Sequence, residues 1–249
     1  MRTLVERVEE AGVPRHVALI MDGNGRWAST RGLARSAGHR AGAEAAERLI
    51  RFVGRRLGIE YLSLFAFSTE NWSRPPTEVD DLMGLLGQFI EEKTGEFVDA
   101  GIRFRVIGDI EGLPAGLAET VRDAIRRTEA GKELHLTIAL NYGSRQEIAR
   151  ACREIGHELA AGALEAAAID EKAVSKHLYT TEIPDPDLVI RTSGETRLSN
   201  FLLWQAAYAE LHFTETYWPA FTPAEFVQIL AGYQGRKRRF GGLGEERTA

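Results

Sequence analysis

Residues 17–27 read Val17-Ala18-Leu19-Ile20-Met21-Asp22-Gly23-Asn24-Gly25-Arg26-Trp27, an apolar run that ends in a polar glycine turn. The run 17–21 is short and apolar and predicts a buried strand. Gly23 and Gly25 let the backbone bend sharply and present N–H groups to an anion. Because ligands of parallel α/β sheets bind outside the carboxyl ends of the strands, the turn also predicts a binding site.

The rest of the chain alternates short apolar runs with longer helical patterns. Further strands are predicted at 61–67, 104–107, 134–140, 188–191 and 211–213. Helices are predicted at 39–57, 78–100, 117–129, 144–160, 170–178, 201–208 and 223–239. This alternation predicts an α/β fold with a mostly parallel sheet that is covered by helices on both faces. Because no linker or repeat divides the chain, we expect a single domain over residues 1–249.

The composition is ordinary for a globular protein, with 44% hydrophobic and 27% charged residues among 249. The formal net charge of −5 gives no electrostatic reason to bind nucleic acid. The single cysteine, Cys152, excludes an intramolecular disulfide and a CxxC metal site, and we expect it in the core. Neither a signal peptide nor an apolar run of ~20 residues is visible. We therefore expect a cytoplasmic protein, with peripheral contact to a membrane left open.

The glycine turn is followed by a dense group of basic side chains, which suits a diphosphate better than a monophosphate. An ordinary strand-to-helix turn with a solvated basic face is the alternative. The pattern is neither a P-loop nor a dinucleotide fingerprint, because the lysine motif and the third glycine are missing. Asp22 ends the strand among these cations, where a Mg²⁺ ion shared with phosphate oxygens would need a carboxylate. The basic residues are Arg26, Arg31, Arg35, His39 and Arg40.

Two further polar clusters follow predicted strands. Residues 68–76 follow the second strand, and helix capping does not explain Asn71, Trp72 and Arg74 together. Residues 191–200 follow the strand at 188–191, and the helix expected from about residue 200 would add N-terminal N–H groups. This stretch is a second predicted anion site. Its side chains include Arg191, Arg197 and Ser199.

The predicted helix at 78–100 has an apolar face that is wider than one packing stripe needs. Either the helix packs on two neighbours, or part of this face lines a cavity for an apolar ligand. The residues of this face are Val79, Leu82, Met83, Leu85, Leu86, Phe89, Ile90, Phe97 and Val98.

Several long motifs closely resemble those of the cis-prenyltransferases, and among them the bacterial undecaprenyl diphosphate synthases. The resemblance covers residues of about 14–242 and implies a single domain with a central, mainly parallel six-stranded sheet, and a homodimer. It also implies Mg²⁺-dependent extension of an allylic diphosphate, typically farnesyl diphosphate, by isopentenyl diphosphate units with cis double bonds. The product would be a polyprenyl diphosphate such as undecaprenyl diphosphate, a cell-wall lipid carrier. The motifs are residues 16–21 with the glycine turn, 38–42, 67–72, 187–205 and 207–211.

The resemblance also implies roles for individual residues. Asp22 would be the essential carboxylate that handles Mg²⁺ and diphosphate, and Glu210 the second Mg²⁺ position. Asn71 matches the proposed proton acceptor; because a neutral amide is a poor base, orienting a phosphate or a water is the alternative. An Arg-x-Gly element at 239–241 matches one associated with the partner's site. The allylic substrate would contact Gly23, Asn24, Gly25, Arg26, Trp27, Arg35 and His39; Ser68, Thr69, Glu70, Trp72 and Arg74 would line the site; and isopentenyl diphosphate would contact Arg191, Arg197, Leu198 and Ser199.

Three rival functions differ in what they require of the sequence. A trans-type synthase needs DDxxD motifs, and here Asp80 and Asp81 lack the later acid. A non-catalytic partner subunit would tend to lose Asp22 and the arginines, which this chain keeps. A short-chain cis-prenyl synthase stays open, because product length depends on the depth of an apolar tunnel. Given that tunnel, the resemblance favours a cavity along the helix at 78–100. Tunnel depth would be set by side chains such as Ala66, Phe67, Leu85, Leu86, Phe89 and Leu134.

Overall fold

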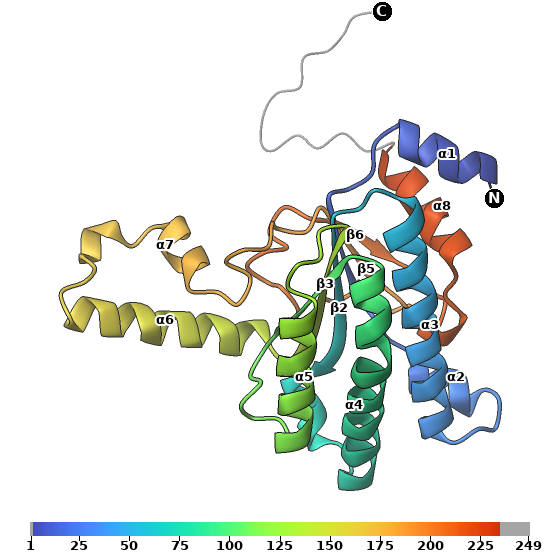
Figure 1. Ribbon diagram of the computed structural model, residues 1–249, viewed down its shortest axis with the longest axis horizontal. Coiled ribbons are helices and arrows are strands. Elements are labelled where there is room, and N and C mark those ends of the chain that lie inside the picture. Colours follow the sequence, from blue (N-terminus) through green and yellow to red (C-terminus); the bar gives the residue numbers. More distant parts are fainter. Residues whose placement is uncertain (1, 235–249) are drawn as a thin grey trace, which may run out of the picture.

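Six parallel strands form the centre of the molecule (Figure 1). The computed structural model describes residues 2–234. The strand order is β3-β4-β2-β1-β5-β6, and all five neighbouring pairs are parallel. This arrangement confirms the predicted α/β fold and its six-stranded sheet. The strands are β1 (His16–Ile20), β2 (Tyr61–Ser68), β3 (Ile102–Ile107), β4 (Leu134–Tyr142), β5 (Leu188–Arg191) and β6 (Glu210–Phe213).

The strand order changes direction between β1 and β5. From β1 the chain moves outward through β2 on one side, and it later returns to β5 on the other side. In the sheet register, Ile20 at the end of β1 is paired with Phe65 of β2 and Arg191 of β5. The segments that follow these three strands therefore leave the sheet at the same edge, at the kind of switch point where open α/β sheets bind ligands.

One face of the sheet is covered by helices that lie side by side in Figure 1. Val17 and Leu19 of β1 point into this main core, which also contains Leu64 of β2 and Ile50 of α3. The terminal helix α1 (Arg2–Glu10) packs against α8. The helices over this face are α3 (Arg35–Arg56), α4 (Pro76–Asp99), α5 (Ala115–Arg127) and α8 (Pro223–Gln234).

The opposite face is covered by turns, so the expectation of helices on both faces is wrong. Residues 201–208, which were predicted to be helical, form a series of turns. Leu202 has a positive φ of 46°, which a right-handed helix excludes. The Phe201 ring is buried and stacks on Phe65 with centroids 4.5 Å apart. Tertiary packing thus overrides the helix propensity of this segment.

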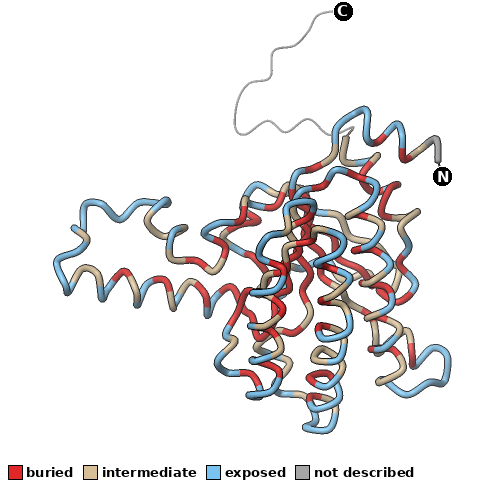
Figure 2. Tube along the Cα trace, in the orientation of Figure 1, coloured by how far each residue is buried: buried red, intermediate tan, exposed pale blue. Residues whose placement is uncertain are grey.

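The helix α6 (Ser144–Ala160), the short turn η2 (Ala166–Ala168) and α7 (Glu171–Lys176) form an arm that projects from the body. Much of the arm is exposed in Figure 2. Cys152 lies on the exposed side of α6, so the prediction that it belongs to the core is wrong.

Three short elements follow the strands near the switch point: α2 (Asn24–Ser29), η1 (Thr69–Ser73) and η3 (Trp218–Ala220). Neither α2 nor α1 is predicted from the sequence. The last part of the helix predicted at 223–239, and the Arg-x-Gly element at 239–241, lie outside the described residues. Among the helices within residues 2–234, none has the length and apolarity that crossing a bilayer requires.

Candidate active site

A cleft of about 690 Å³ lies where β1, β2 and β5 end. It is lined by residues from all three polar clusters of the sequence, so the two predicted anion sites share one cavity. The predicted site residues that line it are Asp22, Gly23, Asn24, Gly25, Arg26, Arg35, His39, Ser68, Glu70, Asn71, Arg74, Arg191, Arg197 and Ser199.

Four other predicted residues lie next to this cleft but are not part of its lining. Trp27 stacks under the guanidinium of Arg31, 4.4 Å from the ring centroid. Trp72 donates from Nε1 to Asn141 Oδ1 at 2.8 Å. Thr69 donates to Glu70 Oε2 at 3.3 Å, and Leu198 packs on the apolar cluster of the second sheet face.

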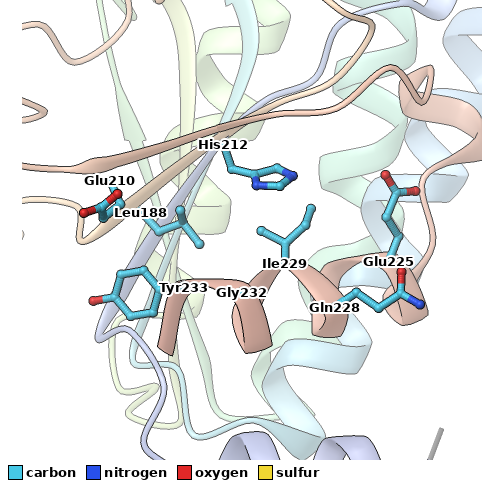
Figure 3. Close-up of a pocket in the computed structure, with 8 residues that line it drawn as sticks. All are labelled: Leu188, Glu210, His212, Glu225, Gln228, Ile229, Gly232 and Tyr233. Atoms are coloured by element: carbon cyan, nitrogen blue, oxygen red, sulfur yellow. The ribbon is translucent and has the colours of Figure 1, made fainter. Parts of the chain in front are cut away.

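Glu210, the predicted second Mg²⁺ residue, lies at the other end of the sheet. It opens β6 and is paired with Leu188, the first residue of β5, whereas the cleft lies where β5 ends. Figure 3 shows Glu210 in a separate groove of about 320 Å³ between β6 and α8, with His212 and Glu225. Within one chain, Glu210 therefore cannot share a metal ion with Asp22.

The glycine turn is shaped by close packing. Gly23 has a φ of 103°, and a Cβ atom there would lie 2.9 Å from both Ser193 Oγ and Tyr217 Cδ1. Gly38 of α3 lies directly against the carbonyl of Asn24, where a side chain could not fit. The turn is thus fixed between α3 and the segment after β5.

Asp22 is held by two arginines and a threonine. Its Oδ2 accepts from Arg191 Nη2 at 2.9 Å and lies 3.1 Å from Arg26 Nη2. Thr192 Oγ1 accepts from the Asp22 N–H at 2.9 Å and donates to the Asp22 carbonyl at 2.7 Å. Burial raises the pKa of Asp22, but the hydrogen bond from Arg191 and the charge of Arg26 outweigh it. The net pKa lies below its usual value, and Asp22 is ionised at neutral pH.

Arg191 organises the segment that follows β5. It is 4% exposed, and its Nη1 donates to Ser199 Oγ at 2.7 Å and to the Arg197 carbonyl. Its Nε is buried without a partner among the described residues. Glu195 lies between the two sets of cations, 3.0 Å from Arg26 Nη1 and paired with Arg197. A buried guanidinium with an unused N–H is suited to an added anion.

Glu78, which the sequence analysis missed, connects three residues of the predicted site. Its Oε1 lies 3.1 Å from Arg74 Nη1, 3.3 Å from Arg35 Nη2 and 3.5 Å from His39 Nε2. Burial lowers the pKa of His39, and Glu78 opposes this effect. The four-residue spacing of Arg74 and Glu78 at the start of a helix was the available signal. The partners from α3 could not be inferred from spacing.

Apolar side chains also contribute to the lining of the cleft. They are Phe65, Ala66 and Phe67 of β2 and Leu82 of α4. Most of α4 lies between α3 and α5, where Phe89 packs against the main core. The wide apolar face of α4 therefore packs on two neighbours and also contributes to the cleft, so each interpretation of this face holds in part.

The cleft offers cations that can bind an anionic group and apolar side chains that can contact an apolar chain. Within residues 2–234, no three carboxylate, histidine or cysteine side chains converge on one point. A single carboxylate is nevertheless a common protein contribution to Mg²⁺ when substrate phosphates supply further oxygens. Asp22, which is ionised and lies in the cleft, fits that role.

Comparisons with known proteins point to one family. A family model described as "Putative undecaprenyl diphosphate synthase" matches residues 20–241. An isoprenyl transferase of Agrobacterium fabrum is 51% identical over 236 residues, which cover 95% of each chain. An isoprenyl transferase of Heliobacterium mobile is 49% identical over 242 residues, which cover 97% of this chain and 93% of that one.

Two solved structures resemble the whole fold. Lavandulyl diphosphate synthase from Lavandula x intermedia, in complex with dimethylallyl diphosphate, has a TM-score of 0.90 and 38% identity. That match covers 93% of this chain and 99% of the other. A "probable undecaprenyl diphosphate synthase" from Campylobacter jejuni has a TM-score of 0.76 and 33% identity, and the match covers 92% and 99%.

Proposed function

The chain belongs to the undecaprenyl diphosphate synthase family of prenyltransferases, and we propose that it extends an allylic diphosphate with isopentenyl diphosphate units, with Mg²⁺ as cofactor and cis geometry at each new double bond. One observation carries this proposal: two sets of cations, after β1 and after β5, flank the ionised carboxylate of Asp22 in one cleft. Two anion sites in one cavity suit two diphosphate substrates whose carbon atoms must be aligned.

The cations after β1 are assigned to the allylic diphosphate. Breaking the allylic C–O bond places negative charge on the departing diphosphate, and guanidinium groups held in the cleft stabilise that charge. Arg26, Arg35 and His39 line the same cleft as the apolar side chains that would contact the prenyl chain. Arg191, Arg197 and Ser199 are assigned to isopentenyl diphosphate.

Asp22 would hold Mg²⁺ together with diphosphate oxygens, and the bound ion would supply Lewis-acid stabilisation of the leaving group. Asn71 is assigned an orienting role. Its Oδ1 accepts from the Ser68 backbone N–H at 3.1 Å, which leaves Nδ2 as the group that can donate to a phosphate. An amide used in this way does not need to accept a proton.

A long polyprenyl diphosphate, such as undecaprenyl diphosphate, is the product proposed first, because the matching family model and one of the similar solved structures are described as undecaprenyl diphosphate synthases. A short-chain product is the second candidate, favoured by the close fold match to lavandulyl diphosphate synthase, whose name denotes a short prenyl product. The tunnel side chains that would decide between them include Ala66, Phe67 and Leu82.

A homodimer is also proposed. The edge strand β6 and the segment before it carry three large apolar side chains that are exposed: Leu203, Tyr208 and Leu211. Exposed apolar groups beside a sheet edge are typical of an interface. Light scattering coupled to size exclusion measures the oligomeric state, and a monomer at micromolar concentration would contradict this part of the proposal. Peripheral contact with a membrane stays a prediction.

The test of function is incubation with farnesyl diphosphate, labelled isopentenyl diphosphate and Mg²⁺, followed by sizing of the products. Repeating the assay with a chelator tests the need for the cation, and dimethylallyl diphosphate as primer tests the short-chain candidate. Absence of labelled product with either primer would refute the proposed reaction.

A further inference from the structure

Asn200 joins three segments at the mouth of the cleft. Its Nδ2 donates to Glu70 Oε1 at 2.9 Å and to Gln146 Oε1 at 3.0 Å. Its Oδ1 accepts from the Arg145 backbone N–H at 2.8 Å, and its carbonyl accepts from the Ser144 N–H at 2.8 Å. One asparagine thus connects the segment after β5, the segment after β2 and the first turn of α6.

The backbone at this junction is constrained. Asn200 has a φ of 63° and Ser199 a φ of 48°, a left-handed conformation that is rare for serine and better tolerated by asparagine. Gly143, which precedes α6, leaves no space for a side chain: a Cβ atom there would meet Gln146 Oε1, the second acceptor of the Asn200 amide, and would lie 2.7 Å from Asn200 Nδ2 and 2.8 Å from Thr69 Oγ1. Strain that surrounding contacts maintain is frequent at functional sites.

Asn200 joins one proposed anion site to the segment that leads to the other. The segment after β5 carries the isopentenyl diphosphate site, and the segment after β2 continues to Arg74, which shares Glu78 with Arg35 and His39 of the allylic site. Glu70 lies in the same short helix as Asn71, and both line the cleft. Ser199 directly precedes Asn200 and accepts the hydrogen bond from Arg191. Glu70 is mostly exposed; burial raises its pKa, but the hydrogen bond from Asn200 and smaller contacts lower it below the usual value. The carboxylate of Glu70 is therefore a charged acceptor for the Asn200 amide.

We propose that Asn200 is a positioning residue: its side-chain amide, bound to Glu70, holds the segment after β2 against the isopentenyl diphosphate site and so aligns the two substrates. This inference rests on the proposed function. The cations that bind each diphosphate do not depend on the Asn200 side chain for their position. Asn200 is connected to Arg197 and Ser199 only because it follows them in the same segment. Loss of the amide should therefore lower kcat more than it raises either KM, because misalignment of reacting atoms acts on the chemical step.

The first test uses Asn200→Gly, which keeps the positive φ without steric cost and removes only the amide. We expect kcat to fall about tenfold, with both KM values within about threefold, and the melting temperature to fall by a few degrees while the protein stays folded at the assay temperature. Hydrogen exchange at residues 69–74 should become faster. Wild-type kcat and exchange in Asn200→Gly would overturn the proposal.

The second test exchanges donor and acceptor. Asn200→Asp places a carboxylate against Glu70, whereas Asn200→Asp with Glu70→Gln restores one donor and one acceptor. We expect kcat of the double variant to be at least about fivefold higher than the value obtained by multiplying the separate effects of Asn200→Asp and Glu70→Gln. Additive effects would overturn the proposal. Gln88→Glu is the matched control, because Gln88 donates to Glu92 at 2.8 Å on the exposed side of α4.

The outcomes separate the inference from the function on which it rests. If the wild-type protein forms no condensation product, the proposed function fails. If the wild type is active and the variants are neutral or additive, only the role of Asn200 fails. Gly143→Ala gives an independent check: it should displace the Asn200 amide and lower kcat in the same way, and a wild-type kcat in this variant would count against the proposal.

Discussion

Arg191 Nη2 and Asp22 Oδ2 lie 2.9 Å apart across the switch point between β5 and β1, and the arginine is 4% exposed. This pair connects the two proposed diphosphate sites through one carboxylate, because Asp22 also contacts Arg26. The cations of both sites are thereby held near the same negative charge before any substrate binds.

Asp22→Asn tests this relationship. The amide keeps the size of the side chain but removes the charge that would hold Mg²⁺ and balance Arg191, so kcat/KM should fall on the order of a thousandfold. The melting temperature should fall only a little, because the carboxylate is partly exposed. Steady-state rates and thermal melts are the measurements. Asp81→Asn, an exposed acid on α4, is the control; more than a tenth of wild-type activity in Asp22→Asn would refute the assignment.

Glu78→Gln addresses the carboxylate that holds Arg35, Arg74 and His39. Removing its charge frees cations to bind diphosphate but leaves them less well ordered. We therefore expect kcat to fall about tenfold while KM for the allylic diphosphate does not rise. Initial rates over a range of allylic substrate give both parameters. A raised KM with normal kcat would show that Glu78 acts on binding alone, and Glu91→Gln on the exposed side of α4 serves as the comparison.

Ser193→Gly should make the protein more stable. Ser193 has a φ of 82°, and its Oγ is buried without a partner among the described residues. Glycine adopts this conformation freely, and the gain should exceed the extra entropy of the unfolded chain, so we expect about 1 kcal/mol of added stability. Urea unfolding measures it. The same change at Ser36, in the first turn of α3, should lower stability, and a loss at both positions would contradict the strain argument.

The fold and most of the cleft follow from one regularity of the sequence, namely that a polar cluster comes directly after each of three apolar strands. Parallel register then brings these clusters together. Glu210 does not obey that rule. It is the first residue of its strand and therefore lies at the opposite end of the sheet, and only the family resemblance placed it in the site.

Long-range packing explains what the sequence patterns did not predict. Residues 201–208 have helical propensity, but the stack of Phe201 on Phe65 requires a different backbone. Glu78 was missed because Arg35 and His39, two of its partners, come from another helix. The junction at Asn200 joins segments that are more than fifty residues apart.

His16 should make stability depend on pH. Its ring is 2% exposed; Nδ1 donates to the Pro184 carbonyl at 2.6 Å, so Nε2 accepts from Ser63 Oγ at 2.8 Å. Burial lowers the pKa of His16 to about 4. In the unfolded chain the pKa is about 6.5, so below that value the unfolded state binds the proton first and stability falls as the pH falls toward 4.

Between pH 7 and pH 5 this single group should lower the free energy of unfolding by about 2 kcal/mol. Urea unfolding of the wild type and of His16→Gln at both pH values measures the effect. The lowered pKa values of His39 and His135 also make the free energy of unfolding fall toward acid pH, and the raised pKa of His177 makes it rise. Because both proteins contain these three histidines, their effects cancel in the difference between wild type and His16→Gln. An equal loss of stability in the wild type and in His16→Gln would show that the buried imidazole is not the cause.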